Sequence, residues 1–261
     1  MPECDSLLAG AGSIGLGLLL LYKCVSRSYD AKLAARLPVS SCGAAQEGLR
    51  KATGHAVSAA SLASPLLGVP CLVSQIDVEA YEGSGNDAKW KSVHQETQSV
   101  PFYVEDQTGR LWVDPSEAEF FLLSDVEFST EKRWKPKPGQ LVKFGETEIT
   151  AEMLEQRVRR YYQQRTASEA HKKKLRFTEK NLMAGDPVTV IGPAYATPGA
   201  QPGTTEIKFH KVHPDDSFVI GDGPPQEIAA RMQKQVLWMR WAGIGFAAVG
   251  VAMVLSCFFE H

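Results

Sequence analysis

Hydrophobic residues concentrate at the two ends of the chain, and polar residues fill the middle. The C-terminal run, WAGIGFAAVGVAMVLSCFF (residues 241–259), carries no charge. As a helix its roughly 19 residues would span about 28 Å, close to the thickness of a bilayer's hydrocarbon core. Trp238, Trp241, Phe258 and Phe259 lie at its ends, as aromatic side chains do at membrane interfaces. We therefore predict a stalk helix that continues into a transmembrane helix over residues 224–261.

The N-terminal end carries a second apolar run, LLAGAGSIGLGLLLLY, over residues 7–22. The main alternative to a membrane anchor is a signal peptide, which begins with a basic region. Here the acidic residues Glu3 and Asp5 precede the run, and no small-residue cleavage pattern follows it directly. A retained transmembrane anchor over residues 1–30 is therefore favoured.

Small residues recur at a spacing of four in both runs, which allows helices to approach closely in lipid. We predict Gly15 and Gly17 in the first run, and Gly243 and Ala247 in the second, as helix-packing residues. The two spans could pack within one chain or between chains. The alternative is that small residues are simply common in membrane spans.

Between the spans the pattern changes twice. Residues 31–53 contain short helical periods that Pro38 and Gly43 interrupt, which predicts a helical linker. From Gly54 onward apolar and polar residues alternate, as in β-strands. The sequence thus predicts a β-rich domain over residues 54–223, followed by the stalk helix.

The strongest local signal in this domain is a β-hairpin, with the strand-like runs FYVED and RLWVD on either side of a short turn. Asp106 and Gly109 are the expected turn residues, because glycine readily adopts a positive φ. The nearby carboxylates of Glu105, Asp106 and Asp114 could indicate a metal or acid–base site. Turn chemistry explains them better.

The alternation is interrupted over residues 150–175, where EMLEQRVRRYYQQRTASEAHKKKL has many charges and lacks Gly and Pro. We predict a helical insertion that begins after Thr150. Its basic end makes Lys172, Lys173, Lys174 and Arg176 candidates for contact with anionic lipid headgroups or an acidic partner protein. The alternative is an ordinary solvated helix face.

Composition adds mainly exclusions. The 28 Lys and Arg residues nearly balance the 30 Asp and Glu residues, so we predict no nucleic-acid partner. The five cysteines form no CxxC pair, and His210 and His213 would point to opposite faces of a strand, so we predict no metal site. No catalytic motif is visible, and we predict neither a catalytic residue nor a cofactor. The predicted fold class is α+β, a β-rich domain of small OB-like or barrel-like sheets with a helical insertion, flanked by two transmembrane helices.

Three segments in their order carry a family resemblance: KSVHQETQSVPFYVEDQTGRLWVDP, RFTEKNLMAGDPVTVIGPA, and FVIGD followed by a helix that runs into a tryptophan-flanked span. This arrangement resembles the GIDE-domain family of RING ubiquitin ligases, found in mitochondria and the chloroplast outer envelope. The resemblance implies an integral protein of an organelle outer membrane, chloroplast or mitochondrion. Its partners would be the lipid bilayer and proteins of the ubiquitination or import machinery.

The resemblance also implies a RING after the second span, which would need eight Cys or His ligands on two zinc ions. Only Glu260 and His261 follow Phe259 here. We therefore expect a membrane-anchored domain that recognises partners or substrates in organelle organisation or protein import, with no RING of its own. One alternative is a ubiquitin-protein ligase whose RING is missing from a truncated chain. Another is a structural membrane protein that oligomerises through its spans.

The side of the membrane stays open between two arguments. Basic residues such as Lys23, Arg27 and Arg240 lie beside the middle domain, and the positive-inside rule would then place that domain in the cytoplasm. The resemblance places it in the intermembrane space, and we favour the resemblance.

Overall fold

The computed structural model describes residues 3–83, 88–129, 143–144, 147–148, 151–165, 174–198 and 205–259. The chain divides into two compact units. The helical unit contains Met1–Val39 and Gly223–His261, and the β-rich unit contains Ser40–Asp222.

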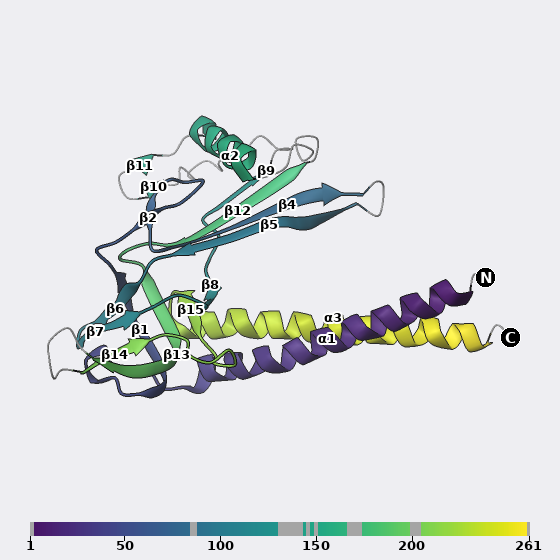
Figure 1. Cartoon of the computed structure of the whole chain (residues 1–261), viewed down its shortest axis with the longest axis horizontal. Helices are drawn as coiled ribbons and strands as arrows, with labels where there is room; N and C mark the ends of the chain where they lie inside the picture. The colour runs from purple at the N-terminus through teal and green to yellow at the C-terminus, as the bar shows by residue number, and fades with distance from the viewer. Residues whose placement is uncertain are drawn as a thin grey trace. The chain divides into compact units, whose positions relative to one another are not determined.

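The helical unit is an antiparallel pair of long helices, α1 (Glu3–Arg36) and α3 (Pro225–Phe259), whose outer ends carry the two chain termini (Figure 1). Both are long and apolar enough to cross a membrane. The unbroken α3 agrees with the predicted stalk and span. Within the predicted linker over residues 31–53, α1 continues to Arg36 and the 3-10 helix η1 covers Cys42–Ala44, but strand β1 begins at Gly48. Pro38 explains the end of α1, because the residue before a proline disfavours helical backbone.

The β-rich unit contains a closed ring of five strands: β1 (Gly48–Val57), β6 (Phe102–Asp106), β7 (Gly109–Val113), β14 (Thr205–Phe209) and β13 (Pro187–Pro198), which pairs back to β1. Only the β7–β14 pairing in this ring is parallel. If the five ring strands are numbered 1 to 5 along the chain, their order around the ring is 1-2-3-5-4 and back to 1. This is the topology of an OB barrel. β15 (Val219–Asp222) and β8 (Glu119–Phe121) extend the sheet from β13.

Alternate residues of the ring strands point into the barrel, as strand geometry dictates. Its core is aliphatic and aromatic, and includes Ala52, Ala56, Phe102, Val104, Leu111, Val113, Val188, Val190 and Phe209.

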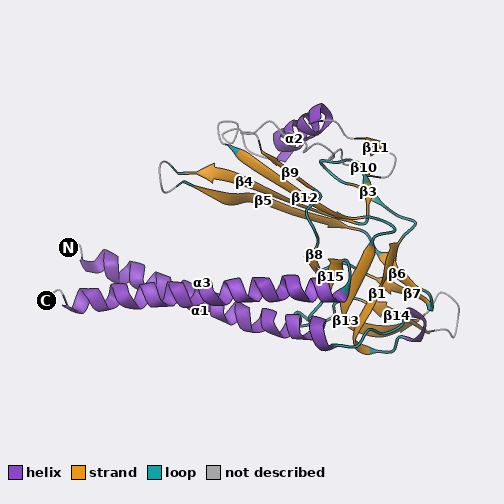
Figure 2. Ribbon diagram, turned by 180° about the vertical axis from the view of Figure 1, so that it is seen from behind, coloured by secondary structure: helices purple, strands orange, loops and turns teal. Residues whose placement is uncertain are grey.

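A second sheet has the order β5 (Lys89–Ser99), β4 (Val73–Glu82), β12 (Leu175–Leu182) and β9 (Val126–Ser129) (Figure 2). The helix α2 (Ala151–Arg165) contributes to a second hydrophobic core with one face of this sheet, through Leu154, Val158, Tyr161, Ile76, Val78 and Phe177. Two short pairs, β2 (Leu62–Ala63) with β3 (Pro70–Cys71) and β10 (Lys143–Phe144) with β11 (Thr147–Glu148), are the remaining strands of the described residues. The α+β class with a barrel between two long apolar helices is thus confirmed.

The helical insertion is shorter than the predicted 150–175. Helix α2 ends at Arg165, residues 166–173 lie outside the described part of the chain, and Leu175 begins strand β12. The reason is visible in LRFTEKNL, whose residues alternate between buried and half-buried positions with the period of a strand.

Candidate functional site

Glycines on both long helices allow α1 and α3 to pack closely against each other. A Cβ built at Gly17 would lie 2.7 Å from the Ala247 nitrogen and 2.8 Å from the Gly243 oxygen. One at Gly250 would lie 2.7 Å from the oxygen of Gly10. Only a hydrogen atom fits at these crossings, so the backbones meet directly.

The four predicted packing residues do not behave alike. Gly17, Gly243 and Ala247 lie at the helix interface, whereas nothing described lies within 4 Å of a Cβ built at Gly15. Gly10 and Gly250 also lie at the interface, and the spacing-four pattern missed them. A spacing of seven, Gly10 to Gly17 and Gly243 to Gly250, is the signal that finds them.

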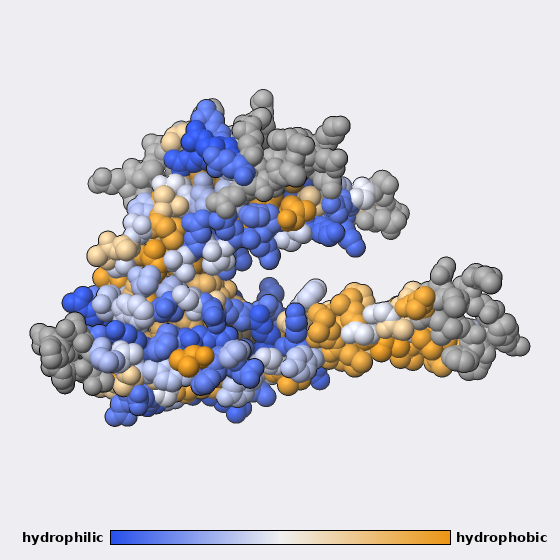
Figure 3. Space-filling model, viewed as in Figure 1, coloured by the Kyte–Doolittle hydropathy of each residue, from blue (hydrophilic) through white to orange (hydrophobic). Residues whose placement is uncertain are grey.

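Two polar contacts add to the pair. The Ser13 hydroxyl donates to the Phe246 carbonyl at 2.8 Å, and the Cys24 thiol donates to the Val236 carbonyl at 3.5 Å. Large apolar side chains cover the outside, including Leu8, Leu16, Leu18, Leu19, Ile244, Phe246, Val249 and Leu255. Figure 3 shows this surface as a predominantly hydrophobic zone toward the termini, bordered by hydrophilic residues at its other end. Apolar surface of this extent marks a contact with lipid or protein.

A collar of aromatic and basic side chains marks the boundary between these zones. Leu21 contacts Gly243, and Cys24 contacts Val236, which shows how α1 and α3 are aligned along their common axis. These contacts place Tyr22 and Lys23 level with the segment Trp238–Trp241, which contains Arg240. Tyr22, Trp238 and Trp241 are 77%, 67% and 65% exposed. From this collar to the termini each helix runs for about 19 residues, or roughly 28 Å. In the other direction each continues for about 15 residues, or roughly 22 Å.

In the β-rich unit the predicted turn residues form a structural clasp. Asp106 pairs with Gly109 across the β6–β7 hairpin. One oxygen of Asp106 accepts hydrogen bonds from the Thr108 N–H at 2.7 Å, the Thr108 hydroxyl at 2.6 Å and the Gly109 N–H at 3.1 Å. The other oxygen accepts from the Cys42 N–H at 2.9 Å. Desolvation opposes ionisation of Asp106, but these hydrogen bonds outweigh it and lower its pKa to about 2.

Two glycines make this clasp possible. A Cβ at Gly43 would lie 2.2 Å from the Thr108 carbonyl oxygen, so only glycine lets η1 approach the hairpin turn. Gly109 has a φ of 154°, which favours glycine. Asp114 also serves a turn, because it accepts from the Ser116 N–H at 3.0 Å. The carboxylate of Asp114 therefore acts in its own turn, and that of Asp106 acts both in its turn and in holding η1 against the hairpin.

The described part of the basic segment is engaged with its own sheet. Lys172 and Lys173 lie outside the described residues. Lys174 is exposed, with its Nζ 5.5 Å from the centre of the Tyr81 ring.

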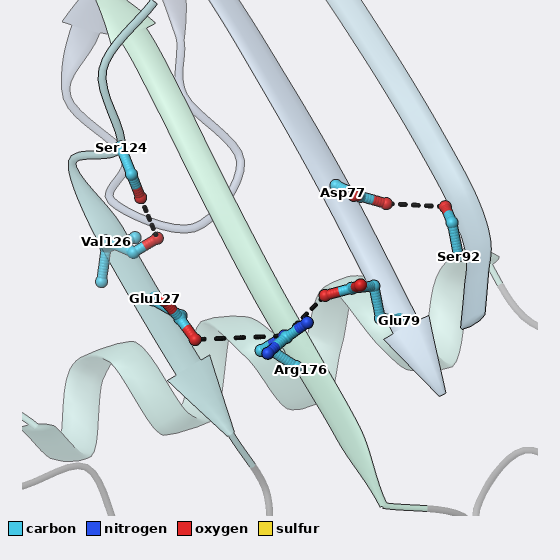
Figure 4. Close-up of polar contacts among 7 residues, drawn as sticks. All are labelled: Asp77, Glu79, Ser92, Ser124, Val126, Glu127 and Arg176. Atoms are coloured by element: carbon cyan, nitrogen blue, oxygen red, sulfur yellow. Dashed lines mark hydrogen bonds and ion pairs between the residues drawn. The ribbon is translucent and has the colours of Figure 1, made fainter. Parts of the chain in front are cut away.

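Arg176 lies in β12 between two carboxylates (Figure 4). Its Nε donates to Glu79 at 2.5 Å and lies 3.9 Å from Glu127, and its guanidinium lies 4.9 Å from the centre of the Trp90 ring. Arg176 thus links all four strands of the second sheet: its own β12, β4 through Glu79, β9 through Glu127 and β5 through Trp90.

A buried carboxylate is the main polar feature that sequence reasoning missed. Glu179 has no exposed surface, and accepts hydrogen bonds from the Leu66 N–H at 2.6 Å, the Leu67 N–H at 3.3 Å and the Asn181 amide at 2.9 Å. The strand pattern could have revealed it: Glu179 lies two residues after the apolar Phe177 in β12, so both side chains point to the same face of the sheet, toward the core. Glu179 fixes residues 65–67 over the second sheet.

Asp125 lies close to Glu179 and accepts from the Asn181 N–H at 2.6 Å. Burial raises the pKa of Asp125 to about 6, and the negative charges of Glu179 and Asp186 add to the rise. The hydrogen bond from Asn181 acts in the opposite direction but is outweighed. Within the described ranges, no three His, Cys, Asp or Glu side chains are grouped to hold a metal ion. His210 instead contacts the Tyr195 ring at a tilted angle, with ring centres 5.0 Å apart.

These features define a β-rich barrel domain carried between two paired helices that are long enough and apolar enough to be membrane spans. Comparison with family models gives the family: residues 75–255 match GIDE, described as E3 ubiquitin ligase. Because the match covers more than half of the chain, the chain belongs to the GIDE family, and the resemblance seen in the sequence is confirmed. Neither the curated proteins nor the solved structures gave a match.

Proposed function

We propose that this protein is a two-span integral membrane protein whose β-rich unit recognises partner or substrate proteins of a ubiquitin-ligase system. The observation that carries the membrane part is the collar at Tyr22, Lys23, Trp238, Arg240 and Trp241, with about 28 Å of apolar helix pair on one side of it. Aromatic and basic side chains suit the boundary between lipid and water, and the apolar length matches a bilayer core.

Two matched substitutions test this placement of the bilayer. Val249 and Leu237 are 56% and 54% exposed on α3, but Val249 lies in the apolar half and Leu237 lies on the other side of the collar. An arginine near the bilayer centre costs about 2.5–3.5 kcal/mol for insertion, and much less outside the hydrocarbon.

We expect Val249→Arg to lower the fraction of the chain that resists alkaline carbonate extraction from membranes, while Leu237→Arg leaves that fraction unchanged. Equal behaviour of the two variants, or complete extraction of the wild type, would show that the pair does not span a bilayer at this depth.

The recognition role rests on the family match, since the family is described as ubiquitin ligases, which act on proteins. By resemblance the membrane would be the outer membrane of mitochondria or chloroplasts, and the role organelle organisation or protein import. Proximity labelling from the β-rich unit should then recover outer-membrane or import proteins. Recovery of secretory-pathway proteins alone would contradict the location. A protease-protection assay on isolated organelles determines which side of the membrane the β-rich unit faces.

The same match favours a second candidate, in which the chain itself takes part in ubiquitin transfer. Incubation of the full chain with ubiquitin, activating enzyme and a panel of conjugating enzymes separates the two. Recognition alone predicts no chain-dependent ubiquitin conjugates. Conjugates that appear only when the chain is present would favour the ligase.

A further inference from the structure

The outer surface of the barrel carries a row of side chains that neither the hairpin clasp nor the helix pair uses. Strand register places Val57 opposite Tyr103, Tyr103 opposite Trp112, Trp112 opposite Lys208, and Lys208 opposite Tyr195. These five residues, here called the aromatic row, come from five consecutive strands of the ring. They point outward, because the residues next to them in sequence are buried in the barrel core: Phe102, Val104, Leu111, Val113, Ala194 and Phe209.

Two cations lie on the aromatic rings of this row. The Arg110 guanidinium lies 5.5 Å from the centre of the Tyr103 ring, and the Lys208 Nζ lies 5.3 Å from the centre of the Trp112 ring. Such contacts hold the positive charges beside the rings. Tyr103 keeps 36% of its surface exposed, and Arg110 is exposed as well. Exposed Tyr and Arg side chains, with Trp beside them, are typical of the binding centres of protein interfaces.

The topology independently points to the same face. OB-type barrels bind extended oligonucleotides and oligosaccharides on the face of the second and third strands, which are β6 and β7 here, so this face accommodates an extended chain. Tyr103 and Arg110 belong to those two strands, and so does Trp112. At about 4.8 Å per strand, the row spans roughly 19 Å along the barrel surface, the length of about six residues of extended chain.

The charges distinguish between possible ligands. Glu105 lies opposite Arg110 in the hairpin, and Glu206 lies 3.4 Å from Lys208. A nucleic-acid backbone, with a phosphate on every nucleotide, would meet both carboxylates. A peptide can place a carboxylate at a cation and an apolar side chain on the neighbouring ring.

We propose that the aromatic row binds an extended segment of a partner protein that carries apolar or aromatic side chains next to a carboxylate. Tyr103 and Trp112 supply the apolar platform, and Arg110 receives the carboxylate. This deepens the recognition role proposed above by naming its surface and the chemistry of its partner, and it does not depend on the organelle.

The test uses the full chain in lipid nanodiscs and a phage-displayed library of random peptides. We expect selected peptides to combine aromatic or apolar residues with Asp or Glu. Tyr103→Ser should weaken their binding about 10- to 100-fold, as loss of an interface anchor does. Val93→Ser is the matched control, because Val93 is 45% exposed on the second sheet and should leave binding unchanged. Arg110→Glu should also weaken binding, and a peptide with Lys in place of its carboxylate should bind this variant better than the wild type. Unchanged circular dichroism verifies that each variant folds.

Three outcomes overturn the proposal. One is a selection that yields no binding peptide, which would also count against recognition by this unit. The second is equal binding by Tyr103→Ser and Val93→Ser, which would leave a recognition role but move it off the row. The third is binding of an oligo-dT strand or a cello-oligosaccharide with the same dependence on Tyr103, which would assign the row to another ligand class. If carbonate extracts the wild type completely but peptide binding is normal, only the proposed membrane insertion is contradicted.

Discussion

The helix pair gives its sharpest prediction at Gly17 and Gly15, which both belong to the small-residue spacing of four. Replacing Gly17 by Ala puts a methyl carbon 2.7 Å from the Ala247 nitrogen and 2.8 Å from the Gly243 oxygen, inside the 3.0 Å that real Cβ contacts respect. Both neighbours are backbone atoms, so no side-chain rotation relieves the clash and the helices must separate. Overpacking of this kind costs about 1–3 kcal/mol.

Gly15→Ala is the matched control, with the same chemical change two residues away. Nothing described lies within 4 Å of the added carbon, so it meets no packing cost from the described part of the chain. Alanine also favours helix over glycine by up to about 1 kcal/mol. Gly17→Ala should therefore be less stable than Gly15→Ala by the packing cost alone.

Thermal unfolding of the full chain in detergent micelles, followed by circular dichroism, measures the difference. A change of 1 kcal/mol moves the midpoint by about 2–4 °C for a chain of this size. Because the helix gain of alanine applies to both variants, Gly17→Ala should melt roughly 2–12 °C below Gly15→Ala, and Gly15→Ala should melt at or slightly above the wild type. If the two variants melt at the same temperature, the helices are not paired through this face.

Three further predictions concern the β-rich unit and use urea unfolding of the solubilised chain unless stated. Asp106→Ala should lower the free energy of unfolding by about 1 kcal/mol at pH 7, after allowance for solvent screening. Because the pKa of Asp106 is lowered to about 2, this loss of stability should persist down to about pH 4 and vanish toward pH 2. Asp125→Asn should behave oppositely: the pKa of Asp125 is raised to about 6, so its ionisation destabilises the fold as pH rises from about 4 through 6. The variant should gain roughly 1–2 kcal/mol at pH 7 and nothing at pH 4, and a loss at pH 7 would contradict this. Tyr161→Phe removes the hydroxyl that donates to Glu96 at 2.8 Å, and should cost about 1 kcal/mol and speed hydrogen exchange in α2; unchanged exchange would show that this bond does not hold the helix.

Local patterns predicted the two long helices and the hairpin because their determinants are close in sequence. An uncharged run of membrane length specifies a helix without reference to the rest of the chain. The turn at Asp106 and Gly109 uses contacts only two or three residues apart. The OB-like barrel was also within reach, since alternating apolar residues indicate strands, although their order in the ring is not a local property.

Features that depend on distant partners could not be predicted in the same way. Gly15 and Gly17 both fit a small-residue spacing, and only the register of α3 selects Gly17. Arg176 looked like part of a free basic end, but its partners Glu79 and Trp90 lie nearly one hundred residues earlier. The same long-range pairing with β4 turns the expected end of the helix at Leu175 into a strand.

The two sheet systems of the β-rich unit differ in what their outer surfaces leave for a partner. On the second sheet, Arg176 is already bonded to Glu79 and lies near Glu127, so a partner's carboxylate there would have to replace existing ion pairs. On the barrel, the Arg110 guanidinium lies beside the exposed Tyr103 ring with Glu105 opposite it in the hairpin, and its several N–H donors can bind a partner's carboxylate as well as Glu105 while an apolar side chain covers the ring. Burying apolar surface contributes about 25 cal/mol per Å², whereas exchanging one exposed ion pair for another contributes little. Recognition of an extended protein segment is therefore favoured on the barrel rather than at Arg176 of the second sheet.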